Sequence, residues 1–360
     1  MLLGLVVHSG SLATVFFAPS EALLDQSIVF LAVLVHNFRM PAFFTLAGLF
    51  GALLLDKLSQ RKFWLQRSKR LALPLLVGQL TIVPLTLASG FDPIVSFEQW
   101  VDAGWMHLWF IFYLLIFSAF ASAGHLLTKT LKAKLGIESF GATRLFKSLG
   151  NPISIFVLAL SSCALPAYFN ESFGALEKSS SFIPDISLLA FYGCFFTFGY
   201  AIYSQWELIS AKVTRQWWVY LLIGSVSFTT YYWLVETNPE NQFLKLLYTN
   251  STWMFSVAIV GLCLRFGNKP TSFAIYFSEA SYWIYLVHLP FVMLSLGWLA
   301  QFSTNLPIAF LATLVMSFTA SVVTYHLFVR KTFIGKFLAG TLAFKSNRHK
   351  KVRSRVSAKN

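Results

Sequence analysis

Ten apolar segments of the chain are each close to the length that crosses a lipid bilayer. A transmembrane helix needs about 20 mainly apolar residues, because each residue advances it by about 1.5 Å through about 30 Å of hydrocarbon. With 56% hydrophobic and only 12% charged residues, a chain of 360 residues cannot cover a water-soluble surface. The sequence therefore predicts an all-α, polytopic membrane bundle, with helices expected over 1–17, 28–55, 71–90, 107–127, 151–169, 185–204, 216–235, 248–265, 273–296 and 306–329.

The segments between these expected helices alternate in charge. Of the 28 Lys and Arg residues, 25 fall in the even-numbered loops or in the tail that begins at Arg330, whereas ten of the 14 acidic residues fall in the odd-numbered loops. Basic loops stay in the cytoplasm during insertion. The alternation predicts an even number of spans, about ten, with both termini in the cytoplasm. We therefore expect a single domain over 1–335 and a basic cytoplasmic tail over 336–360, in the cell inner (cytoplasmic) membrane.

The formal net charge of +14 would by itself be compatible with a nucleic-acid partner. However, most of the Lys and Arg residues lie on one side of the expected bundle, so the positive charge is mainly a signal of membrane topology. The Lys and Arg residues over 345–359 are also suited to lie on anionic lipid. We therefore expect the lipid bilayer as a partner, and no nucleic acid.

Aromatic residues gather at the expected ends of several helices. They are Trp217, Trp218, Tyr220, Tyr231, Tyr232 and Trp233 around 216–235, and Trp105 and Trp109 at the start of 107–127. Amphipathic rings of Trp and Tyr prefer the headgroup level of a bilayer. We expect these residues to lie in interfacial belts.

Arg39 is a charged residue inside an expected span, near its middle. A charge at mid-membrane costs at least about 2.5–3.5 kcal/mol and normally faces a partner or a water-filled cavity. His36 lies three residues earlier on the same helix face, and Pro41, which removes a backbone donor, predicts a kink or local opening. Arg39 and His36 are thus candidates for a functional site, with a clamp on backbone carbonyls as the alternative for Arg39.

Three further histidines fall within or at the ends of expected spans: His8, His107 and His288. A neutral imidazole can accept a proton or attack an acyl carbon, although each of these residues also has a plain structural interpretation. His107 precedes Trp109, and His288 shares one helix face with Tyr285. Glu279 lies near the inner end of the same helix. It either takes part in binding or extends its carboxylate toward the headgroups.

The pattern indicates one polar cavity within the bundle and no metal centre. Neither the HExxH spacing of metalloproteases nor paired carboxylates occur, and no GxxxxGK loop for nucleotide phosphates is found. Cys163, Cys194 and Cys263 lie far apart in apolar stretches and are interpreted as packing residues. We expect no bound cofactor.

Four short motifs resemble, in order, those of the integral-membrane acyltransferases known as the acyltransferase three family, whose members O-acylate glycans. They are Met1-Leu2-Leu3-Gly4-Leu5-Val6-Val7-His8, His36-Asn37-Phe38-Arg39-Met40-Pro41, His107-Leu108-Trp109-Phe110 and Tyr285-Leu286-Val287-His288-Leu289-Pro290. The resemblance extends from residue 1 to about residue 340. It is strongest to the members that act on periplasmic glucans as succinyltransferases.

The resemblance implies transfer of an acyl group, succinyl or acetyl, from cytoplasmic acyl-CoA to a sugar hydroxyl of a cell-envelope glycan. His8 matches the family's essential first-span histidine, a general base or an acyl carrier, and Arg39 and His36 then line the donor or transfer path. His107, Trp109, Tyr285, His288 and Glu279 are the expected substrate-binding residues.

The sequence departs from the family pattern at its start. The family places an arginine eleven residues before the histidine that His8 matches, and that position precedes Met1 here. Either the natural start lies upstream, which we expect, or the protein lacks this arginine and is inactive.

Two other functions are compatible with the residues alone. Pro41 and a charge inside the membrane also fit the broken helices of a secondary transporter or a flippase for a glycan-related substrate. A non-catalytic assembly partner is favoured only if the arginine is absent. The sequence does not distinguish the acyl groups, the glycan acceptors or the oligomeric states.

Overall fold

A computed structural model describes residues 2–90, 95–135, 149–163, 181–239, 241, 243–267, 271–302 and 304–338. Within these ranges the regular structure is entirely helical, as predicted. Seven of the helical runs in this part of the chain are long and apolar enough to cross a membrane. The end of the expected span 151–169 and the tail beyond residue 338 lie outside the described residues.

Each expected span contains a helix. The helices are α1 (Leu3–Phe16), α2 (Leu23–Lys57), α3 (Gln60–Arg67), α4 (Leu73–Ala88), α5 (Phe97–Ala103), α6 (Trp109–Leu135), α8 (Pro152–Cys163), α9 (Ile186–Ile202), α10 (Trp206–Thr237), α11 (Leu244–Phe266), α12 (Ser272–Leu299), α13 (Leu306–Thr324) and α14 (Phe333–Leu338). Short helices join several of them: η1 (Ser68–Ala72), η2 (Met106–Leu108), η3 (Tyr203–Gln205) and η4 (Tyr325–Val329).

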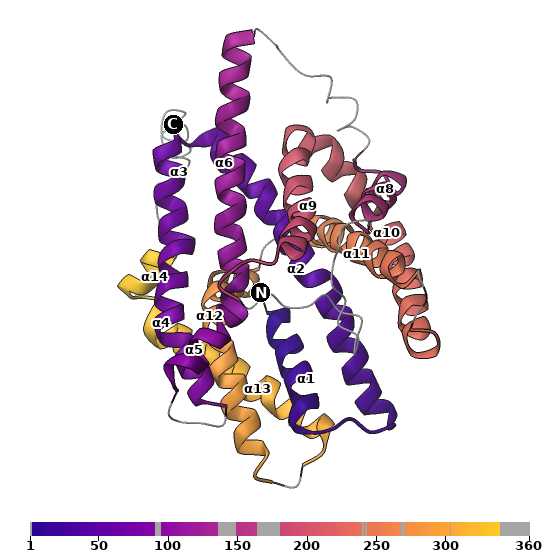
Figure 1. The fold of residues 1–360 in the computed structure, drawn as a ribbon, viewed down its shortest axis with the longest axis vertical. Coiled ribbons are helices and arrows are strands. Elements are labelled where there is room, and N and C mark those ends of the chain that lie inside the picture. Colours follow the sequence, from indigo (N-terminus) through magenta and orange to yellow (C-terminus); the bar gives the residue numbers. More distant parts are fainter. Residues whose placement is uncertain are drawn as a thin grey trace, which may run out of the picture.

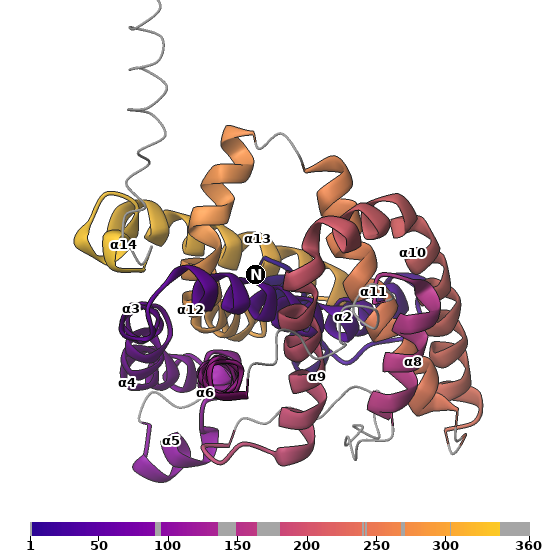
Figure 2. The ribbon, with the colours of Figure 1, turned by 90° about the horizontal axis from the view of Figure 1, so that it is seen from above.

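Helix α2 runs through the middle of the bundle. It packs against α1, α6, α9, α11 and α13. In the view from above, α3, α4 and α6 lie on one side of it and α8, α10 and α11 on the other (Figure 2). The first two helices run side by side in Figure 1, joined by a short connection at their lower ends. A charged residue at the middle of α2 is therefore surrounded by protein and kept away from lipid.

The helix remains continuous through Pro41. Thr45, four residues later, donates a hydrogen bond from its hydroxyl to the carbonyl of Pro41. Pro41 therefore does not interrupt the helix, and the kink that the sequence predicts as the other possibility stays a prediction.

The aromatic residues at helix ends do not all face the membrane. Trp218 and Trp233 are 56% and 62% exposed, as belt residues should be, but Tyr220, Tyr231 and Trp109 are buried. Tyr220 donates a hydrogen bond to the carbonyl of Gly150 across 2.6 Å. The belt prediction is wrong for these three residues, because neighbouring positions on a helix point in different directions and only some of them face outward.

Two glycines allow α2 and α9 to cross closely. A Cβ atom on Gly48 would collide with the carbonyl oxygen of Phe196, and one on Gly199 would collide with the carbonyl oxygen of Thr45. Small residues bring helix backbones together in membrane proteins, where packing replaces the hydrophobic effect as the source of association. This crossing fixes α2 against the aromatic core that contains Phe44, Tyr192 and Trp109.

Replacing Gly48 by Ala is expected to lower the free energy of unfolding by at least about 2 kcal/mol, because the colliding atoms are backbone and cannot move aside. Thermal unfolding of the detergent-solubilised protein measures this. The matched control is Gly124→Ala in α6, where a Cβ meets nothing within 4 Å and stability should be unchanged. Equal melting temperatures for the two variants would contradict the assignment of this crossing.

Candidate functional site

A small cavity in the centre of the bundle collects most of the polar residues that the sequence singled out. Four regions of the chain line it: α1, α2, the η2–α6 junction and α12. The lining residues are Gly4, His8, Arg39, Met40, Phe43, His107, Trp109, Phe110, Tyr285 and His288. Its volume is about 20 Å³, room for one water or one hydroxyl group. We call it the histidine cavity.

Arg39 contributes a buried positive charge to the histidine cavity. It lies near the midpoint of α2, is 8% exposed, and has no carboxylate partner in the part of the chain that the structure describes. Its Nε atom has no hydrogen-bond partner among the described residues. A buried charge is strongly unfavourable without compensation, so this guanidinium is available to an anionic or strongly polarised ligand.

Gly4 makes room for the guanidinium. The position that a Cβ would take on Gly4 lies 3.0 Å from Nη1 of Arg39 and 3.9 Å from Nε2 of His288. The absent side chain therefore lets the guanidinium lie directly against α1, beside an imidazole.

Pro290 determines how His107 is held. In an α-helix the amide of residue 290 would donate to the carbonyl of Leu286, but proline has no N–H. His107 lies across from this carbonyl, and its Nε2 donates a hydrogen bond to it at 3.0 Å. Tyr285 returns a bond from its hydroxyl to the His107 carbonyl at 2.7 Å. His107 is thereby fixed to α12 with Nδ1 buried and unpartnered.

His288 is held through its other nitrogen. Its Nδ1 lies 2.7 Å from the carbonyl oxygen of Tyr285 and 3.1 Å from that of Ile284. Its ring centroid is 5.2 Å from that of His8 and 5.4 Å from that of His107. The three imidazoles thus form a row with His288 in the middle. No group of side chains in the described ranges is arranged to hold a metal ion.

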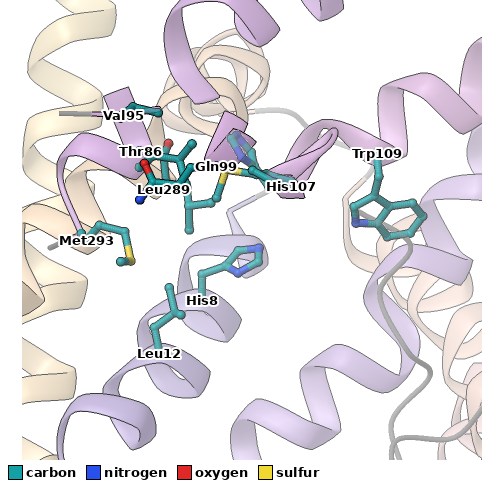
Figure 3. Close-up of a pocket in the computed structure, with 13 residues that line it drawn as sticks. His8, Leu12, Thr86, Val95, Gln99, His107, Trp109, Leu289 and Met293 are labelled. Carbon is teal, nitrogen blue, oxygen red and sulfur yellow. The ribbon is translucent and has the colours of Figure 1, made fainter. Parts of the chain in front are cut away.

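A larger pocket opens beside this row, toward α5. It has a volume of about 560 Å³, within the range of small-molecule sites. His8, His107 and Trp109 line both this α5 pocket and the histidine cavity. In Figure 3 the His8 ring points from α1 toward His107, with Leu289 and Met293 to one side and Trp109 to the other. The half-buried His8 therefore stands at the boundary between the two spaces.

A third space, of about 470 Å³, lies at the end of the bundle where η1, η4, α12 and α14 meet. We call it the arginine pocket, because Arg70 and Arg330 line it together with Ser278, Glu279, Tyr282, Trp283, Tyr325, Val329, Gly335 and Leu338. Both η1 and η4 are π-helical, and single π-helical turns inside α-helices occur frequently at functional sites.

One face of α12 joins the arginine pocket to the histidine cavity. Tyr282 donates a hydrogen bond to the carbonyl of Arg70 at 2.5 Å, and its ring is stacked with that of Tyr285 at 6.4 Å. Tyr285 in turn lies 6.2 Å from the His288 ring. Aromatic and imidazole groups therefore extend without interruption from the two arginines to the centre of the bundle.

The structure does not bring together every residue predicted for the site. His36 lies on α2 one turn before Arg39, is half-buried with contacts of its own, and does not line any of these three spaces. Glu279 is exposed in the arginine pocket, away from the histidines. Four residues that line these spaces are not predicted as site residues from the sequence: Arg70, Arg330, Tyr282 and Gly4. The helical spacing between Tyr282 and Tyr285 could have indicated Tyr282. For the two arginines, the sequence offers only their positive charge.

Comparison with known proteins places the chain in one family. The acyltransferase domain of the acyltransferase 3 family matches residues 1–326. The chain is also 23% identical over 327 residues to glucans biosynthesis protein C of Salmonella schwarzengrund and 22% identical to that of Salmonella paratyphi B, in each case covering 82% of this chain and 80% of the relative. No solved structure matches.

The family match covers nearly all of the described residues, including the histidine cavity and the α5 pocket. It decides between the enzyme and the transporter that the residues alone left open. This multi-pass membrane protein belongs to the acyltransferase 3 family and is an acyltransferase.

Proposed function

We propose that the protein transfers a succinyl or acetyl group from cytoplasmic acyl-CoA to a sugar hydroxyl of a glycan in the cell envelope. The observation that supports this proposal is the position of the histidine cavity between two larger pockets. The cavity shares His8, His107 and Trp109 with the α5 pocket, and the stacked rings of Tyr282 and Tyr285 link it to the arginine pocket. A donor on one side of a membrane and an acceptor on the other need such an arrangement.

Charge supports an orientation with the arginine pocket in the cytoplasm. Its neighbouring helix α3 and segment η1 carry Arg61, Lys62 and Lys69, whereas α5 beside the other pocket carries Glu98 and Asp102. Basic segments remain in the cytoplasm.

The long helical run Ile186–Thr237 is divided by η3, and α1 and α8 are shorter apolar helices, so the described helices are compatible with ten spans and cytoplasmic ends. The membrane proposed is the cytoplasmic (inner) membrane.

The donor fits the arginine pocket by chemistry. The CoA end of the donor carries phosphates, and Arg70 and Arg330 supply positive charge where it would lie. The thin acyl-bearing arm then follows Tyr282 and Tyr285 toward His288. The thioester carbonyl is presented at the Tyr285 side of the histidine cavity, where the guanidinium of Arg39 stabilises the negative charge that develops on its oxygen during attack.

The acceptor fits the α5 pocket. Glucans biosynthesis protein C, the name of the two relatives, refers to glucan synthesis, and a saccharide is the acceptor we propose here. Its hydroxyl passes His8, which acts as a general base or an acyl carrier. Succinyl-CoA and acetyl-CoA are both candidate donors, and an assay with each labelled donor distinguishes them.

Replacing His8 by Ala is expected to abolish transfer while leaving the protein inserted, because the reacting hydroxyl or acyl group loses its imidazole. Transfer of label from radioactive succinyl-CoA or acetyl-CoA to periplasmic glucan, measured in proteoliposomes, checks this. His125→Ala in α6, outside the three spaces, is the control and should be as active as the unchanged protein. Undiminished transfer by the His8 variant would remove this mechanism.

Replacing Gly4 by Ala is expected to reduce kcat about tenfold or more, because the new methyl group displaces the guanidinium of Arg39 from its place beside His288. The guanidinium is the end of a flexible side chain, so stability should change little. Gly124→Ala is again the matched control. A Gly4 variant with normal kcat would show that the position of Arg39 is not critical for transfer.

Replacing Arg70 or Arg330 by Gln is expected to raise the KM for acyl-CoA about tenfold each, with a smaller effect on kcat, because one contact to a phosphate is lost. Arg265→Gln removes the same charge from the end of α11, outside the arginine pocket, and should leave the KM unchanged. Equal effects of all three substitutions would mean that general surface charge, and no defined pocket, attracts the donor.

A further inference from the structure

One ring nitrogen of His288 is hydrogen-bonded to the backbone, and the other has no hydrogen-bond partner in the described residues. Nδ1 lies within hydrogen-bond distance of two backbone carbonyl oxygens, which can only accept, so Nδ1 carries the proton. In the neutral ring Nε2 is then a bare acceptor with a lone pair. It is buried in a residue that is 2% exposed, and no group of the described residues donates to it. Buried acceptors normally have a donor, so this atom calls for one from outside the chain.

The free nitrogen faces the histidine cavity. Nε2 is 3.9 Å from the Cβ position of Gly4, which also lines that cavity, and the nearest charged group there is the guanidinium of Arg39. The cavity has room for a single hydroxyl-sized group. It adjoins the α5 pocket through His8, His107 and Trp109, which line both. A hydroxyl that arrives from the α5 pocket therefore finds Nε2 as its acceptor and Arg39 beside it.

His107 has a comparable arrangement. Its Nε2 donates to the Leu286 carbonyl, its Nδ1 is buried without a partner among the described residues, and its ring lies 5.8 Å from that of Tyr285. What distinguishes His288 is the place of its free nitrogen. Nε2 of His288 is 3.9 Å from the Cβ position of Gly4, and Nη1 of Arg39 is 3.0 Å from that same position. His288 therefore has its free nitrogen beside the guanidinium, where the thioester carbonyl is expected.

We propose that His288 is a further catalytic residue, the base that takes the proton of the attacking hydroxyl at Nε2. The inference rests on the proposed function and deepens it, since it assigns His288 a chemical step beyond substrate binding. In this scheme the base is His288, and His8, at the boundary with the α5 pocket, orients the incoming hydroxyl in place of the two roles given to it above.

The hydroxyl oxygen bonds to the thioester carbonyl carbon while its proton passes to Nε2 of His288. The carbon–sulfur bond breaks and its electron pair stays on sulfur, which then takes the proton from Nε2. The products are the sugar ester and the CoA thiol, and the imidazole is neutral again. Nδ1 keeps its proton throughout, because the two carbonyls hold it in place, and the developing positive charge of the ring is stabilised by them.

The variants His288→Asn and His288→Gln test the assignment. The Asn amide can keep the donor to the backbone carbonyls and removes Nε2, whereas the Gln amide extends to the position of Nε2 but cannot accept a proton. Both are expected to lower kcat about 10²–10⁴-fold with the KM for acyl-CoA changed less than threefold, in the proteoliposome assay with radioactive succinyl-CoA or acetyl-CoA and periplasmic glucan. His125→Asn should match the unchanged protein. A kcat within fivefold of normal in either folded variant overturns the proposal.

If both variants fail to fold, the unchanged protein answers the question. The ¹⁵N spectrum of the histidine-labelled protein should contain the signal pair of a neutral imidazole protonated at Nδ1, and its absence overturns the proposal.

The role of His288 and the proposed function can be disproved separately. If the unchanged protein transfers label to glucan and the His288 variants do so equally well, only the role of His288 is wrong. If it transfers none, the proposed acceptor is wrong, and the spectrum still tests His288.

Discussion

The structure depends on keeping one positive charge, that of Arg39, inside a protein that spans a membrane. Such a charge is tolerated only where protein surrounds it and polar groups face it. Helix α2 meets this condition because it is central, and the glycine crossing with α9 and the absent side chain at Gly4 bring neighbouring helices close on two sides. The histidine cavity is the space that remains around the guanidinium. The geometry of the site thus follows from the packing of the helix that carries the charge.

The backbone of α12 is as important as its side chains. Pro290 leaves the carbonyl of Leu286 without its helical donor, and His107 donates to it. The carbonyls of Ile284 and Tyr285, one turn before His288, hold the Nδ1 atom of that residue. The imidazoles are therefore fixed in known tautomers without any carboxylate partner. This arrangement suits the interior of a membrane, because it orients two basic nitrogens without adding a second buried charge.

Much of this could be predicted from the sequence, for identifiable reasons. Apolar length indicated the helix in each expected span, but not the short helices α3, α5 and α14, which lie outside those spans. The cost of a buried charge singled out Arg39. Helical spacing joined Tyr285 to His288. What the sequence did not reveal depends on contacts between distant segments: the π-helical turns that bring Arg70 and Arg330 to one pocket, the burial of Trp109 and Tyr231, and the separation of Glu279 from the histidines. His36 shares a helix face with Arg39, but helical spacing does not say which spaces the neighbouring helices leave open.

The arginine pocket and the α5 pocket have no described lining residue in common. In the described residues they lie on opposite sides of the groups around the histidine cavity. With the donor and the acceptor placed as we propose, substitutions in α5 and at the α5-facing end of α12 would change acceptor preference while donor preference stays constant, and the reverse would hold for η1, η4 and α14. A fold of this kind can diversify its two specificities independently over evolution, with the same chemistry retained at the centre.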